Sequence, residues 1–409
     1  MAEVQCNAER LSIAQRAALH IVAERASLLE PEAYCKLSSD LRSCGCTKEM
    51  FDEAMSSIRA HARVAVHFHP DRFGLKPLTV AESLLNEGLY LNQFETGLSS
   101  GGRSAFPGGD RDRWERDLFG GAYHTPGVTA AERPKYGALM LVRHPDGPTP
   151  RFGSCYFVLR QNVSKRCTFT FSGSEKPQAI RRLGTIEKML GVIAALLSEV
   201  ASGEGARVPW PPFMASTLGI ESLTIPHLLG VLCRDLSLPP ADLSAGKPGR
   251  VLDSCIEAQI HGPIDLRFDI ERLVIDPSFY GTPIGETLVD ISRKYEIPIQ
   301  HHCGFQLSVH DVPDDFRGPE MPRFARRIAA KGLVTAAVIG VAEATLYCKP
   351  ETWQDWGSYE ETLQDLKQLW HVVVHYGSPA PRYSAGHPPA SLSIQISRNG
   401  NHGGGTIKR

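Results

Sequence analysis

Arg63-Val-Ala-Val-His-Phe-His-Pro-Asp-Arg72 is the stretch of sequence that decides the fold. Val64, Val66 and Phe68 alternate with other residues, which is the period of a β-strand with one face in a hydrophobic core. Pro70 ends the run because proline cannot donate to a strand ladder. The stretch therefore predicts a strand with polar residues gathered at its far end.

The segments on either side of this strand alternate between helical and extended patterns. Periodic apolar residues predict helices at 8–26 and 47–60, with Pro31 following the first. After the strand, the capping box Thr79-Val-Ala-Glu82 predicts a helix that runs to about Glu95. The further predicted elements are strands at 136–142, 154–160, 167–171, 251–261, 273–276 and 298–309, and helices at 178–202, 226–236, 284–296, 322–331 and 351–376.

The region from 98 to 129 is rich in Gly, Ser, Pro and charged residues, which predicts a long surface loop. A loop of this length inside a folded domain is usually functional or mobile. The fold class predicted from these elements is α+β, with a mixed sheet and flanking helices. The predicted organisation is an N-terminal helical segment at 1–62, a main domain at 63–345, a C-terminal helix at 346–376 and a flexible tail at 377–409.

Composition excludes several classes of protein. The 409 residues, 42% hydrophobic and 22% charged, are typical of a globular chain rather than a disordered one. Lys+Arg 44 against Asp+Glu 45 leave a net charge of −1, so no general attraction to nucleic acid or anionic lipid is expected. The 10 cysteines contain no CxxC pair, and we expect reduced thiols. We expect a soluble protein without a cleaved leader, a nucleic-acid partner or a membrane partner.

The first polar cluster lies at the end of the opening strand and allows three interpretations. His67, His69 and Asp71 could bind a metal together with His301-His302, which would make the protein a metal-dependent hydrolase. The two histidines could instead be partly buried and purely structural. In the third interpretation, Arg72 is the working residue, because a guanidinium fixed at a strand end suits bidentate binding of phosphate.

The second cluster is a row of hydroxyl groups on a predicted strand. Thr168, Thr170 and Ser172 project from one strand face by the period of two. Such hydroxyls can hydrogen-bond to a carboxylate on the neighbouring strand. A half-exposed threonine stripe with no function is the plainer alternative, since threonine is common in strands.

The third cluster alternates functional and apolar residues along one strand, Ile256 to Gly262. Glu257, Gln259 and His261 share one face, and apolar residues occupy the other. Three different functional side chains on one face are unusual for a solvated surface. The pattern favours a strand of an active site.

The order of these clusters resembles the R-S-E layout of the ADP-ribosyltransferase fold: a strand-end arginine, a Ser/Thr strand and a glutamate on a late strand. The chain also resembles a bacterial domain family first catalogued as of unknown function, with which CteC-type effectors are associated. These effectors attach ADP-ribose to a threonine of ubiquitin. The resemblance runs from about Arg63 to about Ala336 and rests on four motifs: HFHPDR at 67–72, LNEGLYLNQFETG at 85–97, RPKYG at 133–137, and EAQIHG at 257–262 followed by Asp276-Pro-Ser.

The resemblance implies a role for each matching residue. Arg72 would bind the phosphates of NAD, Glu257 would be the catalytic glutamate, and Thr168 and Thr170 would support the site. The resemblance implies no metal. The other residues it assigns to the NAD site are His67, His69, Tyr136 and Gln259, with Phe106, or alternatively Phe94, against the nicotinamide.

One departure from arginine-modifying transferases bears on the acceptor. Those enzymes carry a second carboxylate two residues before the catalytic one, and this chain has Cys255 there. The resemblance thus implies a hydroxyl acceptor, with His261 among the histidines that assist its deprotonation or support the site through hydrogen bonds. It also implies a secreted effector that acts in the host cytoplasm and blocks ubiquitination. A protein-binding module without catalysis remains the non-enzymatic alternative.

Overall fold

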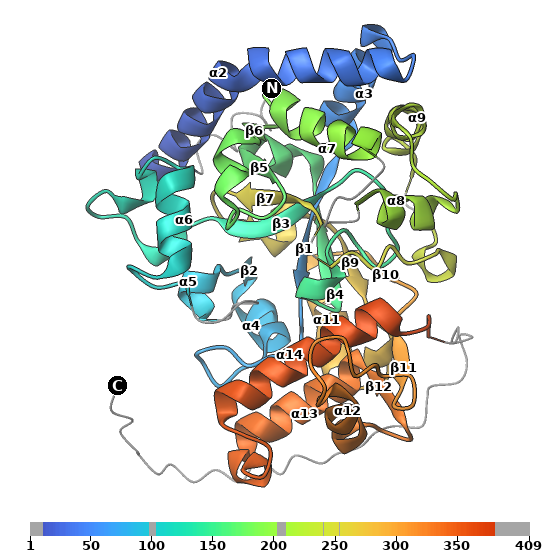
Figure 1. The fold of residues 1–409 in the computed structure, drawn as a ribbon. Coiled ribbons are helices and arrows are strands. Elements are labelled where there is room, and N and C mark those ends of the chain that lie inside the picture. The colour runs from blue at the N-terminus through green and yellow to red at the C-terminus, as the bar shows by residue number, and fades with distance from the viewer. Residues whose placement is uncertain (1–10, 98–103, 203–209, 240, 253, 381–409) are drawn as a thin grey trace.

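The computed structural model describes residues 11–97, 104–202, 210–239, 241–252 and 254–380. It is an α+β protein built on a mixed eight-stranded sheet (Figure 1). Neighbouring strands are antiparallel except for the first two in the sheet order. That order is β10 (Ile299–His301), β9 (Ile270–Ile275), β4 (Cys155–Leu159), β1 (Arg63–Phe68), β3 (Lys135–Met140), β7 (Ile256–Ile260), β5 (Cys167–Phe171) and β6 (Leu183–Thr185).

Two small antiparallel sheets and a set of helices complete the described structure. The small sheets pair β2 (Leu89–Tyr90) with β8 (Ile264–Asp265), and β11 (Gln306–Ser308) with β12 (Leu333–Thr335). The helices are α2 (Ile13–Ser43), α3 (Lys48–His61), α4 (Val80–Glu87), α5 (Gln93–Thr96), α6 (Asp110–Leu118), α7 (Leu190–Ser202), α8 (Trp210–Leu218), α9 (Ile225–Asp235), α10 (Leu266–Asp269), α11 (Pro283–Tyr295), α12 (Met321–Ile328), α13 (Ala336–Cys348) and α14 (Tyr359–Tyr376).

Strand β1 is confirmed and lies near the centre of the sheet, between β3 and β4. Val64 and Val66 are fully buried on one face, and Ala65 is fully buried on the other. A strand covered on both faces positions its end rigidly, because every side chain along it is packed. The polar residues after Phe68 therefore follow a fixed element.

Helices cover the sheet at both of its ends (Figure 1). The long α2 packs on α7 and on the edge strand β6, and α3 packs on α9. At the other end, α14 contacts α12 and α13 and also the short 3-10 helix Pro150–Phe152, which precedes β4. This last contact brings the C-terminal helix close to the end of β1.

The first helix is longer than the sequence predicted. α2 continues to Ser43 with Pro31 inside it. Val22 and Leu37, on either side of this proline, are both buried. Packing against α7 and β6 therefore outweighs the single hydrogen bond that Pro31 cannot make.

The prediction of one long loop at 98–129 is wrong where α6 forms. Most residues of α6 are charged, so the apolar period of a helix is weak there. Asp112 and Glu115 on this helix are buried, and both form ion pairs with Arg133. Buried ion pairs thus stabilise a helix that hydrophobic periodicity does not predict.

Other predicted elements are divided in the structure. The helix predicted to reach Glu95 ends at Gly88, whose φ of 69° breaks it, and β2 and α5 follow. The predicted helix 178–202 contains β6 and α7, and the predicted strand 298–309 contains the two short strands β10 and β11. The last helix, predicted from 351, begins at Tyr359 as α14. The expected boundary at 345 falls inside α13, a helix that periodicity did not predict.

Two remaining expectations concern the tail and the membrane. Most of the predicted flexible tail, from 381 onward, lies outside the described residues. Within the described ranges, each helix is too short or too polar to cross a lipid bilayer.

Candidate functional site

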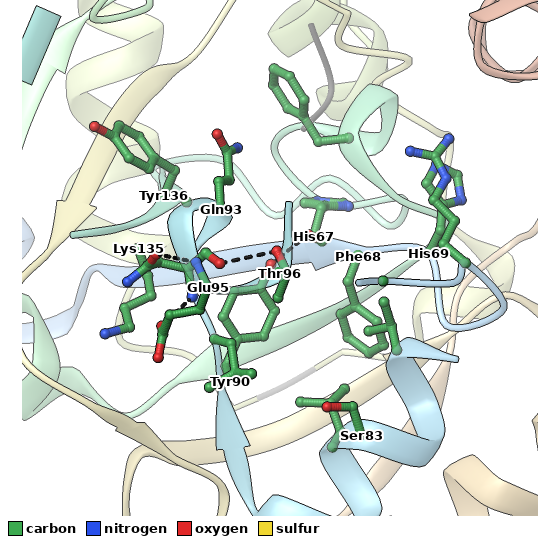
Figure 2. A pocket seen from close by; sticks show the side chains of 18 of the residues that line it. His67, Phe68, His69, Ser83, Tyr90, Gln93, Glu95, Thr96, Lys135 and Tyr136 are labelled. Atoms are coloured by element: carbon green, nitrogen blue, oxygen red, sulfur yellow. Dashed lines mark hydrogen bonds between the residues drawn. The ribbon is translucent and has the colours of Figure 1, made fainter. Parts of the chain in front are cut away.

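A cavity of about 370 Å³ lies between the end of β1, the first residues of β3, the segment α4 to α5, and α6. Its lining comes from segments far apart in the sequence. Figure 2 shows Tyr136 and Gln93 at one end of this cavity, His69 at the other, and Ser83 on α4 below. The volume is that of a pocket for a small molecule or a cofactor.

Arg72 lies just beyond β1 and lines the cavity. Its Nε is 3.4 Å from Oε2 of Glu343 on α13. Burial raises the pKa of Glu343, and the charge of Arg72 opposes that rise. Among the described residues no hydrogen bond is found for Arg72, its buried Nε included, so the ion pair with Glu343 orients the guanidinium and leaves its terminal nitrogens for a ligand.

Glu257 is the second residue of β7 and lines the same cavity. Its Cα pairs with Ala138 on β3 and with Thr170 on β5. One carboxylate oxygen accepts hydrogen bonds from the Ser174 backbone N–H (3.2 Å) and from Gln259 Nε2 (2.9 Å). The structure therefore brings Glu257 and Arg72 to one cavity, as the predicted site required.

The environment of Glu257 favours a carboxylate that can take up a proton. Burial raises its pKa above the ordinary range, and the positive charge of Arg111 is the largest effect opposing that rise. The hydrogen bonds from Ser174 and Gln259 also favour the charged form. The effect of burial is larger than these opposing effects, so the pKa of Glu257 remains raised.

The hydroxyl strand and the glutamate strand are joined by Gln259. The register pairs Thr168 with Gln259 and Thr170 with Glu257, so the predicted common face is confirmed. Gln259 Nε2 donates to Glu257 Oε1 (2.9 Å) and to Thr170 Oγ1 (3.2 Å), and its Oε1 accepts from Thr168 Oγ1 (2.8 Å). Gln259 and the two threonines are buried and do not line the cavity, so they hold Glu257 rather than contact a ligand.

His261 does not line the cavity, so it cannot contact a ligand there as a catalytic residue would. It is fully buried, is not among the residues that line the cavity, and its pKa is lowered to about 3, mainly by burial. Its Nδ1 is 2.5 Å from the Tyr123 hydroxyl, and its Nε2 is 3.1 Å from Thr168 Oγ1. Because Thr168 donates to Gln259, we assign the proton to Nε2. The neutral ring is a distant support of the Gln259 network.

His67 and His69 are buried at the end of β1 and border the cavity. His67 Nδ1 is 3.0 Å from the Gly153 carbonyl, and its Nε2 accepts from the Thr149 backbone N–H at 3.3 Å. Burial lowers the pKa of His67 to about 3 and the pKa of His69 well below its ordinary value. Both are therefore neutral at physiological pH.

The metal-dependent alternative finds little support in this geometry. Both ring nitrogens of His67 are engaged with backbone atoms. His302 likewise has Nε2 2.8 Å from the Ser154 carbonyl and accepts the Gly304 backbone N–H at Nδ1. In the described residues, no group of three His, Cys, Asp or Glu side chains is arranged to hold a metal ion. The histidines thus act as packed, hydrogen-bonded residues.

The structure corrects the choice of aromatic residue. The Phe106 side chain is 52% exposed on the segment before α6, and Phe94 packs against Arg133 at 4.6 Å; neither lines the cavity. Tyr136, which the resemblance assigned to the site, does line it. Trp114 on α6 lines it as well, so planar rings for a ligand come from α6 and β3.

Arg111 and Trp114 were not predicted as site residues because their segment has the composition of a loop. Arg111 lies over the Tyr136 ring at 4.3 Å and near the Trp114 ring at 5.6 Å. Its buried Nε and Nη1 have no hydrogen-bond partner among the described residues. The Tyr136 hydroxyl donates to Glu115 at 2.8 Å, which fixes this end of the cavity. The only signal in the sequence was the charge density of the segment.

Fold and cavity together define an α+β protein in which a half-buried carboxylate and an ion-paired guanidinium face one ligand-sized cavity. The chain belongs to the family DUF3626, described as proteins of unknown function, whose model matches residues 63–376. The match begins with β1 and ends with α14, so the unit includes the C-terminal helix. No curated protein matches the chain.

Proposed function

We propose that this protein is a mono-ADP-ribosyltransferase that cleaves NAD and transfers ADP-ribose to a threonine of ubiquitin. The proposal includes an ADP-ribosyltransferase-like core and action as a secreted effector in the host cytoplasm, where the modification blocks ubiquitination. The observation that carries it is the convergence of Arg72 and Glu257 on one cavity, although they come from distant parts of the chain. A strand of buried hydroxyl side chains lies directly beside Glu257.

The cavity residues fit the chemical parts of NAD. The guanidinium of Arg72 can bind the pyrophosphate as a fork, since its terminal nitrogens are uncommitted in the described structure. Tyr136 and Trp114 offer planar faces for a base, with the charge of Arg111 beside them. Glu257 supplies a carboxylate for the ribose. These groups lie around one cavity, as a single extended ligand requires.

The reaction follows from the charge that develops on the ribose. The bond between ribose C1 and nicotinamide breaks, and its electron pair passes to the nicotinamide, which leaves as a neutral molecule. The Glu257 carboxylate stabilises the resulting oxocarbenium character. The acceptor hydroxyl oxygen then bonds to C1, and its proton passes to Glu257. A raised pKa suits a residue that must accept this proton.

The residue before the catalytic strand bears on the acceptor. Cys255 lines the cavity, and burial raises its pKa well above the ordinary value, so its thiol is neutral. A neutral group at this position offers no counter-charge to a substrate guanidinium. This supports a hydroxyl acceptor over arginine.

The test is incubation of the full chain with labelled NAD and ubiquitin, followed by mass spectrometry of the modified threonine. Glu257→Gln should fold and bind NAD but transfer ADP-ribose about 10²- to 10⁴-fold more slowly, whereas the exposed Glu286→Gln should behave as the wild type. Full transfer by Glu257→Gln would remove this residue from the mechanism. If calorimetry detected no NAD binding by the wild type, the transferase proposal would fall and a protein-binding module would replace it.

A further inference from the structure

Two side chains that line the cavity, Arg111 and Gln93, carry buried polar atoms that have no hydrogen-bond partner among the described residues. On Arg111 these atoms are the donors Nε and Nη1, and on Gln93 the atom is the acceptor Oε1. Buried polar atoms in folded proteins are nearly always hydrogen-bonded, and each one left alone costs stability. Open donors and an open acceptor in one cavity therefore point to a ligand that completes them.

Helix α6 holds Arg111 at the cavity on a rigid support. Arg111 and Trp114 are three positions apart, so they share one face of the helix, and both line the cavity. Asp112 and Glu115 share the neighbouring face and are held there by their ion pairs with Arg133. A guanidinium on a helix that is fixed in this way is pre-organised, so little conformational entropy is lost when a ligand binds.

Gln93 reaches the same end of the cavity from α5. Asn92, the residue before it, is 2% exposed, and its Nδ2 lies 3.3 Å from the Arg133 carbonyl, to which it donates. Phe94, the residue after it, packs on the Arg133 guanidinium at 4.6 Å. Both neighbours of Gln93 thus attach α5 to the residue that also anchors α6. Figure 2 shows the Gln93 side chain at the end of the cavity where Tyr136 lies.

The surroundings of the open atoms favour a neutral planar group over an anion. The Arg111 guanidinium lies over the Tyr136 ring at 4.3 Å and near the Trp114 ring at 5.6 Å, so ring surfaces adjoin the open donors. Burial acts to lower the pKa of Arg111, but Tyr136 and the negative charge of Glu257 outweigh burial and raise it. A phosphate or carboxylate would be repelled by Glu257 and by the amide oxygen of Gln93.

We propose that Arg111 and Gln93 bind a planar ligand group that carries a hydrogen-bond acceptor next to an amino group. Arg111 donates to the acceptor, and the amide oxygen of Gln93 accepts from the amino group. A primary carboxamide on an aromatic ring has this edge, and so does adenine. Both occur in NAD, so the assignment to one end of NAD rests on the proposed function. Because the charge of Glu257 acts on Arg111 and would act at the nicotinamide ribose, we expect the carboxamide here.

The direct test is a ligand-detected NMR titration of the full chain with nicotinamide, nicotinic acid and adenosine. Nicotinic acid has the same ring with a carboxylate in place of the amide, so it offers Gln93 no donor. We expect nicotinamide to bind more tightly than the other two. Arg111→Met should weaken nicotinamide binding about 10- to 100-fold, the effect of losing one charge-assisted hydrogen bond. Arg116→Met, at an exposed position on the same helix, is the matched control and should bind as the wild type.

Gln93→Leu gives a readout that damage to the fold would not give. The substitution preserves the approximate volume and removes the acceptor, so nicotinamide binding should weaken about 3- to 10-fold while nicotinic acid binding does not weaken. A general loss of structure would weaken both ligands equally. Because a buried atom without a partner is removed, the variant should melt no lower than the wild type. Gln354→Leu, at an exposed position, is the control, and Gln93→Met provides the same comparison if Gln93→Leu does not fold.

The outcomes separate this subsite from the proposed enzyme. A wild type that binds neither nicotinamide nor adenosine, or an unchanged preference for the amide in Gln93→Leu, would overturn the subsite. Adenosine binding that depends on both side chains, without nicotinamide binding, would retain the subsite and assign it to adenine. Nicotinamide binding that depends on Gln93 in a protein that does not consume NAD would retain the subsite and remove the transferase. Consumption of NAD with a KM that neither Arg111→Met nor Gln93→Leu changes would retain the transferase and remove the subsite.

Discussion

Gln259→Leu tests whether the buried network behind the cavity sets the protonation of Glu257. The substitution preserves the approximate volume but removes three hydrogen bonds: to Glu257, Thr170 and Thr168. Each contributes about 0.5–1.5 kcal/mol net, so the free energy of unfolding should fall by about 1.5–4.5 kcal/mol. Urea denaturation followed by circular dichroism measures this loss.

The same substitution should shift the pH dependence of transfer. The hydrogen bond from Gln259 favours the charged form of Glu257 and lowers its pKa. Without it, the pKa of Glu257 rises further above its already raised value, so the acidic limb of the pH–rate profile should move to higher pH. Thr168→Val is the control, because it removes the hydrogen bonds of Thr168 with Gln259 Oε1 and His261 Nε2 but keeps the hydrogen bond from Gln259 to Glu257. An acidic limb identical to that of the wild type, in a folded variant, would refute the coupling.

Further predictions concern three charged residues: Glu257 and Arg72, which line the cavity, and Lys367 on α14. Glu257→Gln should lower kcat by about 10²- to 10⁴-fold, or about 3–5 kcal/mol of transition-state stabilisation. The same variant should have a higher melting temperature than the wild type at pH 7 but not at pH 4. The reason is that a carboxylate whose folded pKa is raised destabilises the folded state as pH rises. Equal melting temperatures at pH 7 would contradict this. Arg72→Lys keeps a charge beside Glu343 but loses the fork, so NAD affinity by calorimetry should fall roughly 10-fold; unchanged affinity would count against the phosphate role. The folded pKa of Lys367 is lowered to about 7, so the free energy of unfolding of the wild type should rise as pH increases from about 7 toward the ordinary lysine pKa. In urea titrations, Lys367→Met should abolish this rise and Lys349→Met, at an exposed position, should keep it. A rise that persists in Lys367→Met would assign it to another group.

The face of each site strand was predictable because it depends on a local period. Side chains two residues apart share a face whatever the rest of the chain does. That rule places Glu257 with Gln259 and Thr168 with Thr170 on sequence spacing alone, and the β5–β7 register confirms that the two faces meet. The same rule identifies β1 and its polar end.

The two-residue period of a strand does not predict how deeply each of these side chains is buried. His261 shares the face of Glu257, yet it is fully buried beside Tyr123, whereas Glu257 reaches the cavity. Burial depends on which elements cover each point along a strand, and those elements are remote in sequence. The roles of the two residues therefore separate only in three dimensions.

Hydrophobic periodicity did not predict the charged helix α6. α6 lacks a clear apolar period because its buried residues, Asp112 and Glu115, are held by ion pairs with Arg133. Without that helix, Arg111 and Trp114 could not be assigned to the site. Ion pairs between distant residues leave no periodic pattern in either segment.

The sequence by itself determined the α+β class, the central strand, and the two residues that meet at the cavity, Arg72 and Glu257. Tertiary structure decided that Glu343 orients Arg72, and that α6 brings Arg111 and Trp114 to the same cavity. Periodicity and turn chemistry act over a few residues and can be read along the chain. Charge balance and desolvation depend on groups brought together by folding, and these exist only in the packed molecule.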